Sequence, residues 1–215
     1  MSERSAPSGL AAGTIASPVG ELHVACSPDG LARVDFGRPG GQRPLPAAAP
    51  DAARDLLAEA LRQLEGYFAG QRRDFALPVD WTGVSETQQR VLSALTGAAG
   101  YGQTLTYGEL AKRAGLPDGG DSGGQRATGG PGVPPGRQSV PPGEYRPPAR
   151  VVGQVMGSNR CPVIVPCHRV VAGNGLGGYS GGTGIEIKRW LLIFEGALPP
   201  TLDWDPTGAG LRQPG

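Results

Sequence analysis

The sequence predicts two structural units: a small α/β unit, in which an antiparallel sheet packs on a helix, and then a mainly helical unit that contains a helix-turn-helix. Strand-like alternation within residues 13–36, followed by helical spacing of apolar residues over 51–69, indicates the first unit. Two helix starts with capping-box sequences indicate the second unit. A chain of 215 residues is long enough for one or two domains. We place the units at residues 1–80 and 81–198, with a C-terminal tail at 199–215.

Composition shows that the chain is uneven. It contains 37 glycines and 22 prolines, yet 38% of its residues are hydrophobic, which is enough for a core. A formal net charge of +1 excludes a strongly basic nucleic-acid binder as a description of the whole chain. No segment has the roughly 18 consecutive apolar residues of a membrane helix, and the N-terminus lacks the pattern of a secretory signal. We therefore expect a cytoplasmic protein with no membrane partner.

The first unit begins with strands and ends with a helix. Residues 20–36 are typical of two strands around the turn at 27–30. The following segment predicts a helix over 51–69, with Asp51 as its N-cap and Gly70 as its stop. A short strand is expected over residues 74–79.

The second unit opens with two capped helices. Ser85 and Gln88 have the spacing of a capping box, and so do Thr106 and Glu109. The second of these helices should end at Gly115, where glycine favours termination. Two capped helices joined by a short link are consistent with the start of a helix-turn-helix, although other helical domains offer the same pattern.

Periodicity disappears over residues 118–148. This stretch holds nine glycines and seven prolines among 31 residues, and few apolar side chains. Burial cannot offset the entropy lost on ordering such a segment, so we expect a disordered insertion. Regular structure should resume with a helix over 149–157, and a final helix is expected over 185–194, ended by Gly196.

The sequence Pro166-Cys167-His168-Arg169 is the sharpest chemical feature. A neighbouring imidazole can convert a thiol to the reactive thiolate, and Arg169 would add positive potential. Side chains of adjacent residues point apart on a strand, so the backbone must turn here, and a bridging water is the natural link. The alternative is a buried structural cysteine beside a surface histidine.

An acidic residue, Glu195, ends the apolar sequence WLLIFEG. A carboxylate in apolar surroundings is costly unless it is paired, so a Cys167–His168–Glu195 relay is possible. The alternative is an ordinary solvent-facing glutamate at a helix end. The three cysteines, which include Cys26 and Cys161, should be free thiols, because an odd number suits a reducing compartment better than a disulfide framework.

A wider pattern surrounds this motif. Upstream lie Tyr107-Gly108-Glu109-Leu110-Ala111, Arg150 to Gly153 and Asn159, and downstream lie Gly178-Tyr179-Ser180-Gly181-Gly182 and Lys188-Arg189-Trp190 with Glu195-Gly196. Together with PCHRV at 166–170, these residues resemble the O6-alkylguanine-DNA alkyltransferases, also called methylated-DNA–protein-cysteine methyltransferases. The resemblance covers residues 84–197 well and the first unit more loosely.

The resemblance implies a fold, a reaction and a set of roles. The helical unit should be winged-helix-like, and the protein should move the alkyl group of O6-alkylguanine, and of O4-alkylthymine, irreversibly to its own cysteine. Cys167 would be the acceptor, His168 and Glu195 the relay that forms the thiolate, and Asn159 the residue that orients it. Tyr107 would hydrogen-bond the base and assist its departure. Val170, Tyr179 and Ser180 would line the guanine pocket.

The resemblance also implies how the chain meets double-stranded DNA. The helix over 149–157 would enter the minor groove, and Arg150 would fill the space of a base flipped out of the duplex. Small residues such as Ala149 and Gly153 would permit a close approach. We expect a monomer that needs no cofactor. Some members of the family bind zinc in the N-terminal domain, but His23 and Cys26, which have a ligand-like spacing, lack a second pair of ligands, so we expect no metal site.

Three rival functions remain open on the sequence. The first is a protein that binds alkylated DNA without transfer, like the alkyltransferase-like proteins, which lack the acceptor cysteine. The second is a cysteine hydrolase that uses the same three residues. The third is a transcription factor, which would leave the need for a thiol relay unexplained.

Overall fold

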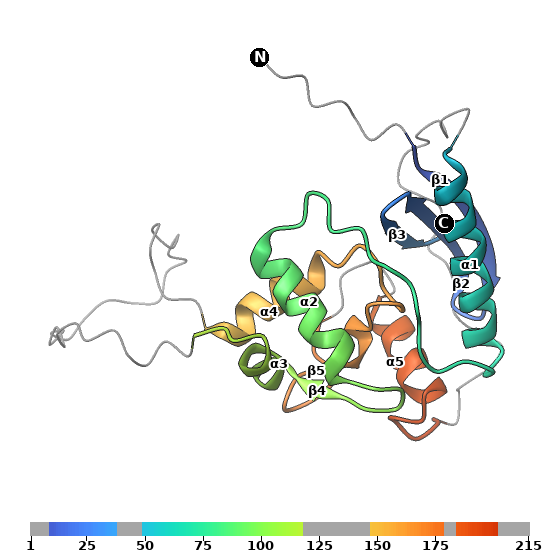
Figure 1. The fold of residues 1–215 in the computed structure, drawn as a ribbon. Helices are drawn as coiled ribbons and strands as arrows, with labels where there is room; N and C mark the ends of the chain where they lie inside the picture. Colours follow the sequence, from blue (N-terminus) through green and yellow to red (C-terminus); the bar gives the residue numbers. More distant parts are fainter. Residues whose placement is uncertain (1–8, 38–48, 118–146, 179–183, 202–215) are drawn as a thin grey trace, which may run out of the picture.

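The computed structural model describes residues 9–37, 49–117, 147–178 and 184–201. Figure 1 shows two bodies side by side: a sheet covered by one long helix, and a group of shorter helices. The predicted fold class is confirmed. The segments of the predicted insertion from 118 to 146 lie outside the described residues, and so do residues 202–215 of the predicted tail.

The N-terminal sheet is a meander of three antiparallel strands in the order β1-β2-β3. Its strands are β1 (Ala11–Ser17), β2 (Gly20–Ser27) and β3 (Gly30–Phe36). The predicted turn at 27–30 joins β2 and β3, whose ends pair Ser27 with Gly30. Alternate residues of β2, among them Leu22 and Val24, are buried, because successive side chains of a strand point to opposite faces.

Helix α1 (Asp51–Phe68) packs across this sheet, as Figure 1 shows. Its buried side chains, including Leu64 and Tyr67, recur at helical spacing. The prediction that Asp51 caps the helix was wrong: Pro50 holds the N-cap position without a side-chain bond, and Asp51 is the first helical residue. Gly70 has the expected left-handed conformation, with φ of +71°.

The expected strand over 74–79 does not form. The segment instead makes one bridge, between Leu31 and Val79, and its Ala76 exchanges hydrogen bonds with the buried side chain of Gln63. An amide side chain therefore satisfies backbone groups that a partner strand would otherwise pair.

The helical unit begins with α2 (Glu86–Ala98) and α3 (Tyr107–Arg113). Both predicted capping boxes are present, with Ser85 and Gln88 at the first helix and Thr106 and Glu109 at the second. A two-residue strand, β4 (Leu105–Thr106), lies directly before α3 and pairs in parallel with β5 (Val170–Val171).

Helix α4 (Pro148–Gly157) packs against both α2 and α3. It starts with Pro148 at the first helical position, where a missing N–H costs nothing. The two helices of the predicted helix-turn-helix are thus α3 and α4, which pack against each other. Helix α5 (Gly184–Phe194) ends the unit, and Gly196 follows it in a left-handed conformation.

The two bodies share a seam of specific bonds. Val34 of β3 donates its backbone N–H to the carbonyl of Arg160, at 2.8 Å. Tyr67 of α1 donates its hydroxyl to the carboxylate of Glu195, at 2.7 Å. Within the described residues, no helix combines the length and the apolar character that crossing a bilayer requires.

Candidate active site

The segment from Cys161 to Val170 is buried throughout and forms a tight turn in the helical unit. Asn159 ties this turn together: its Nδ2 donates to the carbonyl of Val165 at 2.9 Å, and its Oδ1 accepts from the backbone N–H of Cys161 at 3.0 Å. Inside the turn, Val163 adopts a φ of +71°, which is strained for a β-branched residue. The two bonds of Asn159 stabilise a turn that its own residues do not favour.

Cys167 begins a single 3-10 turn, η1 (Cys167–Arg169), within this segment. This is the backbone turn that the sequence required if adjacent cysteine and histidine side chains were to cooperate. Cys167 is only 5% exposed, and it lines a pocket of about 470 Å³. The other residues that line this pocket, called here the Cys167 pocket, are Tyr107, Ala149, Gly153, Met156, Gly157 and Gly178.

His168 and Glu195 meet behind the cysteine, as the relay hypothesis required. Nε2 of His168 lies 3.0 Å from Oε1 of Glu195, and both side chains are buried completely. The alternatives of a surface histidine and a solvent-facing glutamate do not describe this structure. Because an ionised carboxylate can only accept, Nε2 carries the imidazole proton and Nδ1 is left as the acceptor.

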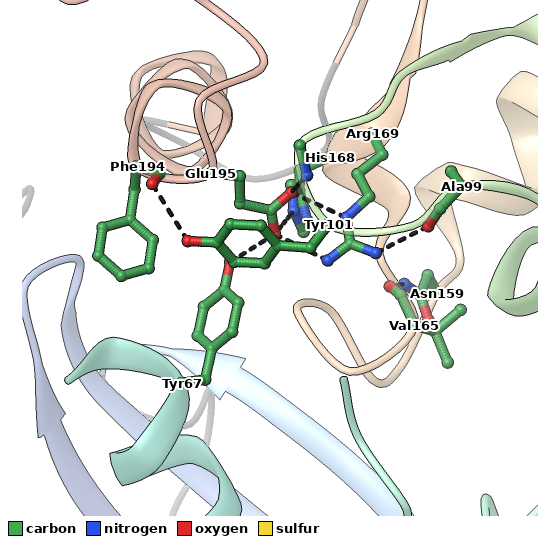
Figure 2. A network of polar contacts seen from close by, with 10 residues as sticks. Tyr67, Ala99, Tyr101, Asn159, Val165, His168, Arg169, Phe194 and Glu195 are labelled. Carbon is green, nitrogen blue, oxygen red and sulfur yellow. Dashed lines mark hydrogen bonds and ion pairs between the residues drawn. The ribbon is translucent and has the colours of Figure 1, made fainter. Parts of the chain in front are cut away.

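Arg169 neutralises the carboxylate. Its Nε donates to Oε2 of Glu195 at 2.9 Å and its Nη2 donates to Oε1 at 2.8 Å, while Nη1 donates to the carbonyl of Ala99 (Figure 2). Burial alone would raise the pKa of Glu195, but the hydrogen bonds and charges of His168 and Arg169 lower it to about 2. Arg169 was expected to add positive potential near the thiol, and the structure engages its charge with Glu195.

His168 is therefore held as a neutral base. Burial lowers its pKa below the ordinary value, and the hydrogen bond that it donates to Glu195, together with the charge of Glu195, offsets this only in part. Its Nδ1 is buried, and no described residue gives it a hydrogen bond. An acceptor without a protein partner in this position can receive a proton that leaves a neighbouring thiol.

Lys188 supplies the positive charge that Arg169 does not. Its side chain is buried on α5, and Nζ donates to the carbonyls of Val170, at 2.7 Å, and Gly178, at 3.4 Å. Burial lowers the pKa of Lys188 to about 8, while its interaction with the charge of Cys167 acts in the opposite direction. At neutral pH the ammonium group is therefore protonated close to the thiol, where it favours the thiolate.

Tyr107, the first residue of α3, also lines the Cys167 pocket. Its hydroxyl donates to the carbonyl of Gly178 at 3.1 Å. Burial, and after it the charge of Cys167, raises the pKa of Tyr107, so the phenol keeps its proton and can donate it. Gly177 lies against the ring, since a Cβ at this position would come within 2.9 Å of it.

The predicted DNA-contacting residues share α4. Arg150 is exposed near the start of the helix, and Ala149 and Gly153 form part of the pocket wall. Val170 is buried, and its carbonyl is occupied by Lys188. Tyr179 and Ser180, which were expected to line the guanine pocket, lie outside the described residues.

The two remaining cysteines are unsuited to nucleophilic chemistry. Burial raises the pKa of Cys26 to about 11 and, with smaller contributions from neighbouring charges, that of Cys161 to about 12. Both are free thiols in the core, as is Cys167. Among the described residues, no group of three His, Cys, Asp or Glu side chains could hold a metal ion.

Tyr67 and Lys188 were not identified as site residues from the sequence. The pairing of Arg169 with Glu195 was also not predicted. Lys188 precedes Glu195 by seven residues, two helical turns, which could have placed both on one face. A buried acid also requires a cation, and Arg169 adjoins His168. No sequence signal could have identified Tyr67, which is 128 residues from the carboxylate that it contacts.

Comparison with known proteins agrees with this arrangement. Family models described as the 6-O-methylguanine DNA methyltransferase ribonuclease-like domain and DNA binding domain match residues 10–81 and 143–197. A methylated-DNA–protein-cysteine methyltransferase of Methanosarcina acetivorans is 34% identical over 185 residues, which cover 84% of this chain and 95% of the relative. A DNA base-flipping protein of Thermus thermophilus is 31% identical over 186 residues, which cover 85% and 97% of the two chains.

A solved structure extends the comparison to three dimensions. The crystal structure of Mycobacterium tuberculosis OGT in complex with DNA matches with a TM-score of 0.60 and 32% identity, covering 86% of this chain and 91% of that one. Sequence and fold thus agree over both units with the same group of proteins. The chain belongs to the methylated-DNA–protein-cysteine methyltransferase family, whose members repair DNA by transferring alkyl groups to a cysteine of the protein.

Proposed function

We propose that Cys167 is the acceptor in this chain and that it takes the alkyl group from O6-alkylguanine, and from O4-alkylthymine, in double-stranded DNA. One observation carries the proposal: Cys167 opens into a pocket while its neighbour His168 is buried against Glu195. A pocket of about 470 Å³ lies within the size range of small-ligand sites, and a purine base is a small ligand. The product thioether has no route back to a thiol, so each molecule acts once.

The reaction balances without a cofactor. The thiol proton of Cys167 passes, through one water, to Nδ1 of His168, and Lys188 stabilises the thiolate. The sulfur attacks the alkyl carbon, so that an S–C bond forms as the O6–C bond of the base breaks. Guanine is a better leaving group when it departs neutral, and Tyr107 has a protonated phenol at the pocket to hydrogen-bond it and supply that proton. The phenolate then regains a proton from solvent, and His168 releases the thiol proton to solvent.

The base must leave the duplex to reach Cys167, at a cost of a few kcal/mol. Helix α4 places the exposed Arg150 beside the pocket wall made by Ala149 and Gly153. A guanidinium combines positive charge with a flat face that stacks on bases, so Arg150 can occupy the space that the base leaves. Asn159 orients the turn that carries Cys167, while Val170, Tyr179 and Ser180 contribute main-chain or side-chain groups to reading the base.

Substitution of Arg150 tests this part of the proposal. The Arg150→Ala variant should transfer methyl from duplex DNA about 10-fold more slowly, because a lost stacking and charge contact costs about 1–3 kcal/mol. Its transfer from free O6-methylguanine should be unchanged. The matched control is Arg62→Ala, which removes the same charge from the exposed face of α1. Equal losses with the duplex and with the free base would contradict the role of Arg150.

A second candidate function is recognition of alkylated bases without transfer, which the printed name of the Thermus thermophilus relative, a base-flipping protein, makes relevant. The two functions differ in whether the alkyl group moves from the DNA to the protein. With a duplex carrying a radiolabelled O6-methyl group, transfer predicts one labelled methyl per protein molecule and none for Cys167→Ala. Reversible binding with all label left on the DNA would favour the second function.

Two further statements belong to the proposal. The site is formed by residues of one chain, which supports action as a monomer. A reactive thiolate needs a reducing environment, and the cysteines in this structure are free thiols, which supports a cytoplasmic location.

A further inference from the structure

The carboxylate of Glu195 lies where the two structural units meet. On one side are His168 and Arg169, both from the turn that carries Cys167. On the other side is Tyr67, from the last turn of α1 in the N-terminal unit. Its hydroxyl donates to Oε1 of Glu195 at 2.7 Å, and its side chain is fully buried. Figure 2 shows the phenol pointing from the helix toward this carboxylate.

Oε1 is the oxygen that holds the imidazole. It accepts from Nε2 of His168, Nη2 of Arg169 and the hydroxyl of Tyr67. Oε2 accepts from Nε of Arg169 and, at 3.4 Å, from the backbone N–H of Gly102. Two of these donors, His168 and Arg169, belong to the Cys167 turn itself. The phenol of Tyr67 approaches from a different structural unit and fixes Oε1 independently.

Aromatic neighbours hold the phenol in place. The ring of Tyr67 lies 5.0 to 6.1 Å, between ring centroids, from those of Phe68, Phe75, Phe194 and Tyr101. Burial raises the pKa of Tyr67 well above its usual range, and the negative charge of Glu195 and the hydrogen bond to it act in the same direction. The phenol thus remains protonated at neutral pH and can serve the carboxylate as a donor.

We propose that Tyr67 is a positioning residue for the Cys167–His168–Glu195 relay, through which docking of the N-terminal unit sets the reactivity of the thiol. The inference rests on the proposed function of Cys167. The phenol fixes Oε1 at Nε2 of His168, which keeps the proton on Nε2 and leaves Nδ1 free to accept the thiol proton. Without it, the carboxylate is less fixed and the imidazole samples unproductive orientations or the other tautomer.

The test compares two tyrosine-to-phenylalanine variants in the full chain. Tyr67→Phe removes the bond to the carboxylate and keeps the ring. Tyr101→Phe is the matched control, because Tyr101 belongs to the same aromatic cluster but donates to the main-chain carbonyl of Phe194, at 3.2 Å. Three quantities are measured: the rate of iodoacetamide labelling of Cys167 against pH, the rate of methyl transfer from duplex DNA, and the Kd for undamaged duplex.

For Tyr67→Phe we expect labelling at neutral pH and methyl transfer to fall together by about 10-fold, the value of one hydrogen bond to a charged group. The labelling profile should move to higher pH, and the Kd for undamaged duplex should not change. For Tyr101→Phe all three should stay within about 2-fold of the wild type. Equal losses in both variants, or no loss in either, would overturn the proposal, because packing alone would then account for Tyr67.

A spectroscopic measurement separates positioning from a general loss of structure. The chain has two histidines, His23 and His168, so the ring-nitrogen NMR signals are few and a His23→Gln variant assigns them. Tyr67→Phe should shift the ring signals of His168 away from the Nε2-protonated form, and unchanged signals would count against the role. Labelling and NMR need no DNA, so they test Tyr67 even if the wild-type chain accepts no alkyl group, a result that would refute the proposed function alone.

Discussion

At the scale of single residues, two basic side chains near Cys167 have different tasks. The charge of Arg169 is paired with Glu195, because its guanidinium donates hydrogen bonds to both carboxylate oxygens. Lys188 donates to main-chain carbonyls, which carry no formal charge, and therefore keeps its charge for the thiol. The relay of His168, Glu195 and Arg169 thus moves a proton without adding net charge, and Lys188 provides the electrostatic stabilisation.

Replacing Lys188 should make Cys167 less reactive at neutral pH. In Lys188→Gln the pH midpoint of iodoacetamide labelling of Cys167 should rise by about one unit, the effect of removing one nearby opposite charge. The chain offers a matched control, since its other lysine is Lys112, which is exposed on α3. An unchanged midpoint in Lys188→Gln, or an equal rise in Lys112→Gln, would show that Lys188 does not stabilise the thiolate.

At the scale of structural elements, features that depend on residues close in sequence could be predicted, and features that depend on contacts between distant residues could not. The capping boxes at Ser85 and Thr106 were confirmed because each is complete within four residues. The strand expected over 74–79 was wrong because the side chain of Gln63, from α1, satisfies backbone groups of that segment. The Cys167 motif was visible in the sequence, but its contact with Tyr67 depends on how α1 docks, which no local pattern encodes.

The glycine-rich segment that follows β5 also positions a side chain of the site, because its Gly177 lies against the ring of Tyr107. Gly177 has a φ of +72°, and a Cβ there would meet the Tyr107 ring at 2.9 Å and the backbone N of Ala172 at 3.2 Å. A side chain at this position is therefore opposed by both backbone conformation and space.

Gly177→Ala should therefore displace Tyr107 from the Cys167 pocket. Methyl transfer should fall by about 10-fold or more, since a left-handed conformation alone costs an alanine about 1–2 kcal/mol. Gly173→Ala is the control, because a Cβ at Gly173 meets no atom within 4 Å. The rate of transfer from duplex DNA measures the effect. A Gly177→Ala variant that reacts as fast as Gly173→Ala would contradict the steric argument.

At the scale of the whole molecule, Glu195 links the chemistry to stability. Its carboxylate joins α5, the Cys167 turn and the N-terminal unit through Tyr67. Its pKa is about 2 when folded, against an ordinary value of 4.5. The folded state thus binds this proton more weakly than the unfolded state does, and the stabilisation is present above pH 4.5 and is lost as the pH falls toward 2.

A shift of this size corresponds to about 3 kcal/mol of unfolding free energy. Urea unfolding of the wild type should therefore show stability falling between pH 4.5 and 2, and Glu195→Gln should show a flatter dependence together with lower stability at neutral pH. The control is Glu59→Gln: the pKa of Glu59 is also lowered to about 2, but its pair with Arg62 is exposed and is screened by solvent. Parallel curves for the wild type and Glu195→Gln would contradict the assignment.

The central claim is that Cys167, and no other cysteine, accepts the alkyl group, and mass spectrometry tests it most directly. After incubation with duplex DNA containing O6-methylguanine, the intact protein should gain the mass of one methyl group in place of one hydrogen. Trypsin cleaves after Arg160 and Arg169, so the peptide that carries Cys167 also carries Cys161, and fragment ions must distinguish them. The account predicts one methyl on Cys167; a methyl on Cys161 or Cys26, or an unmodified protein beside fully methylated DNA, would contradict it.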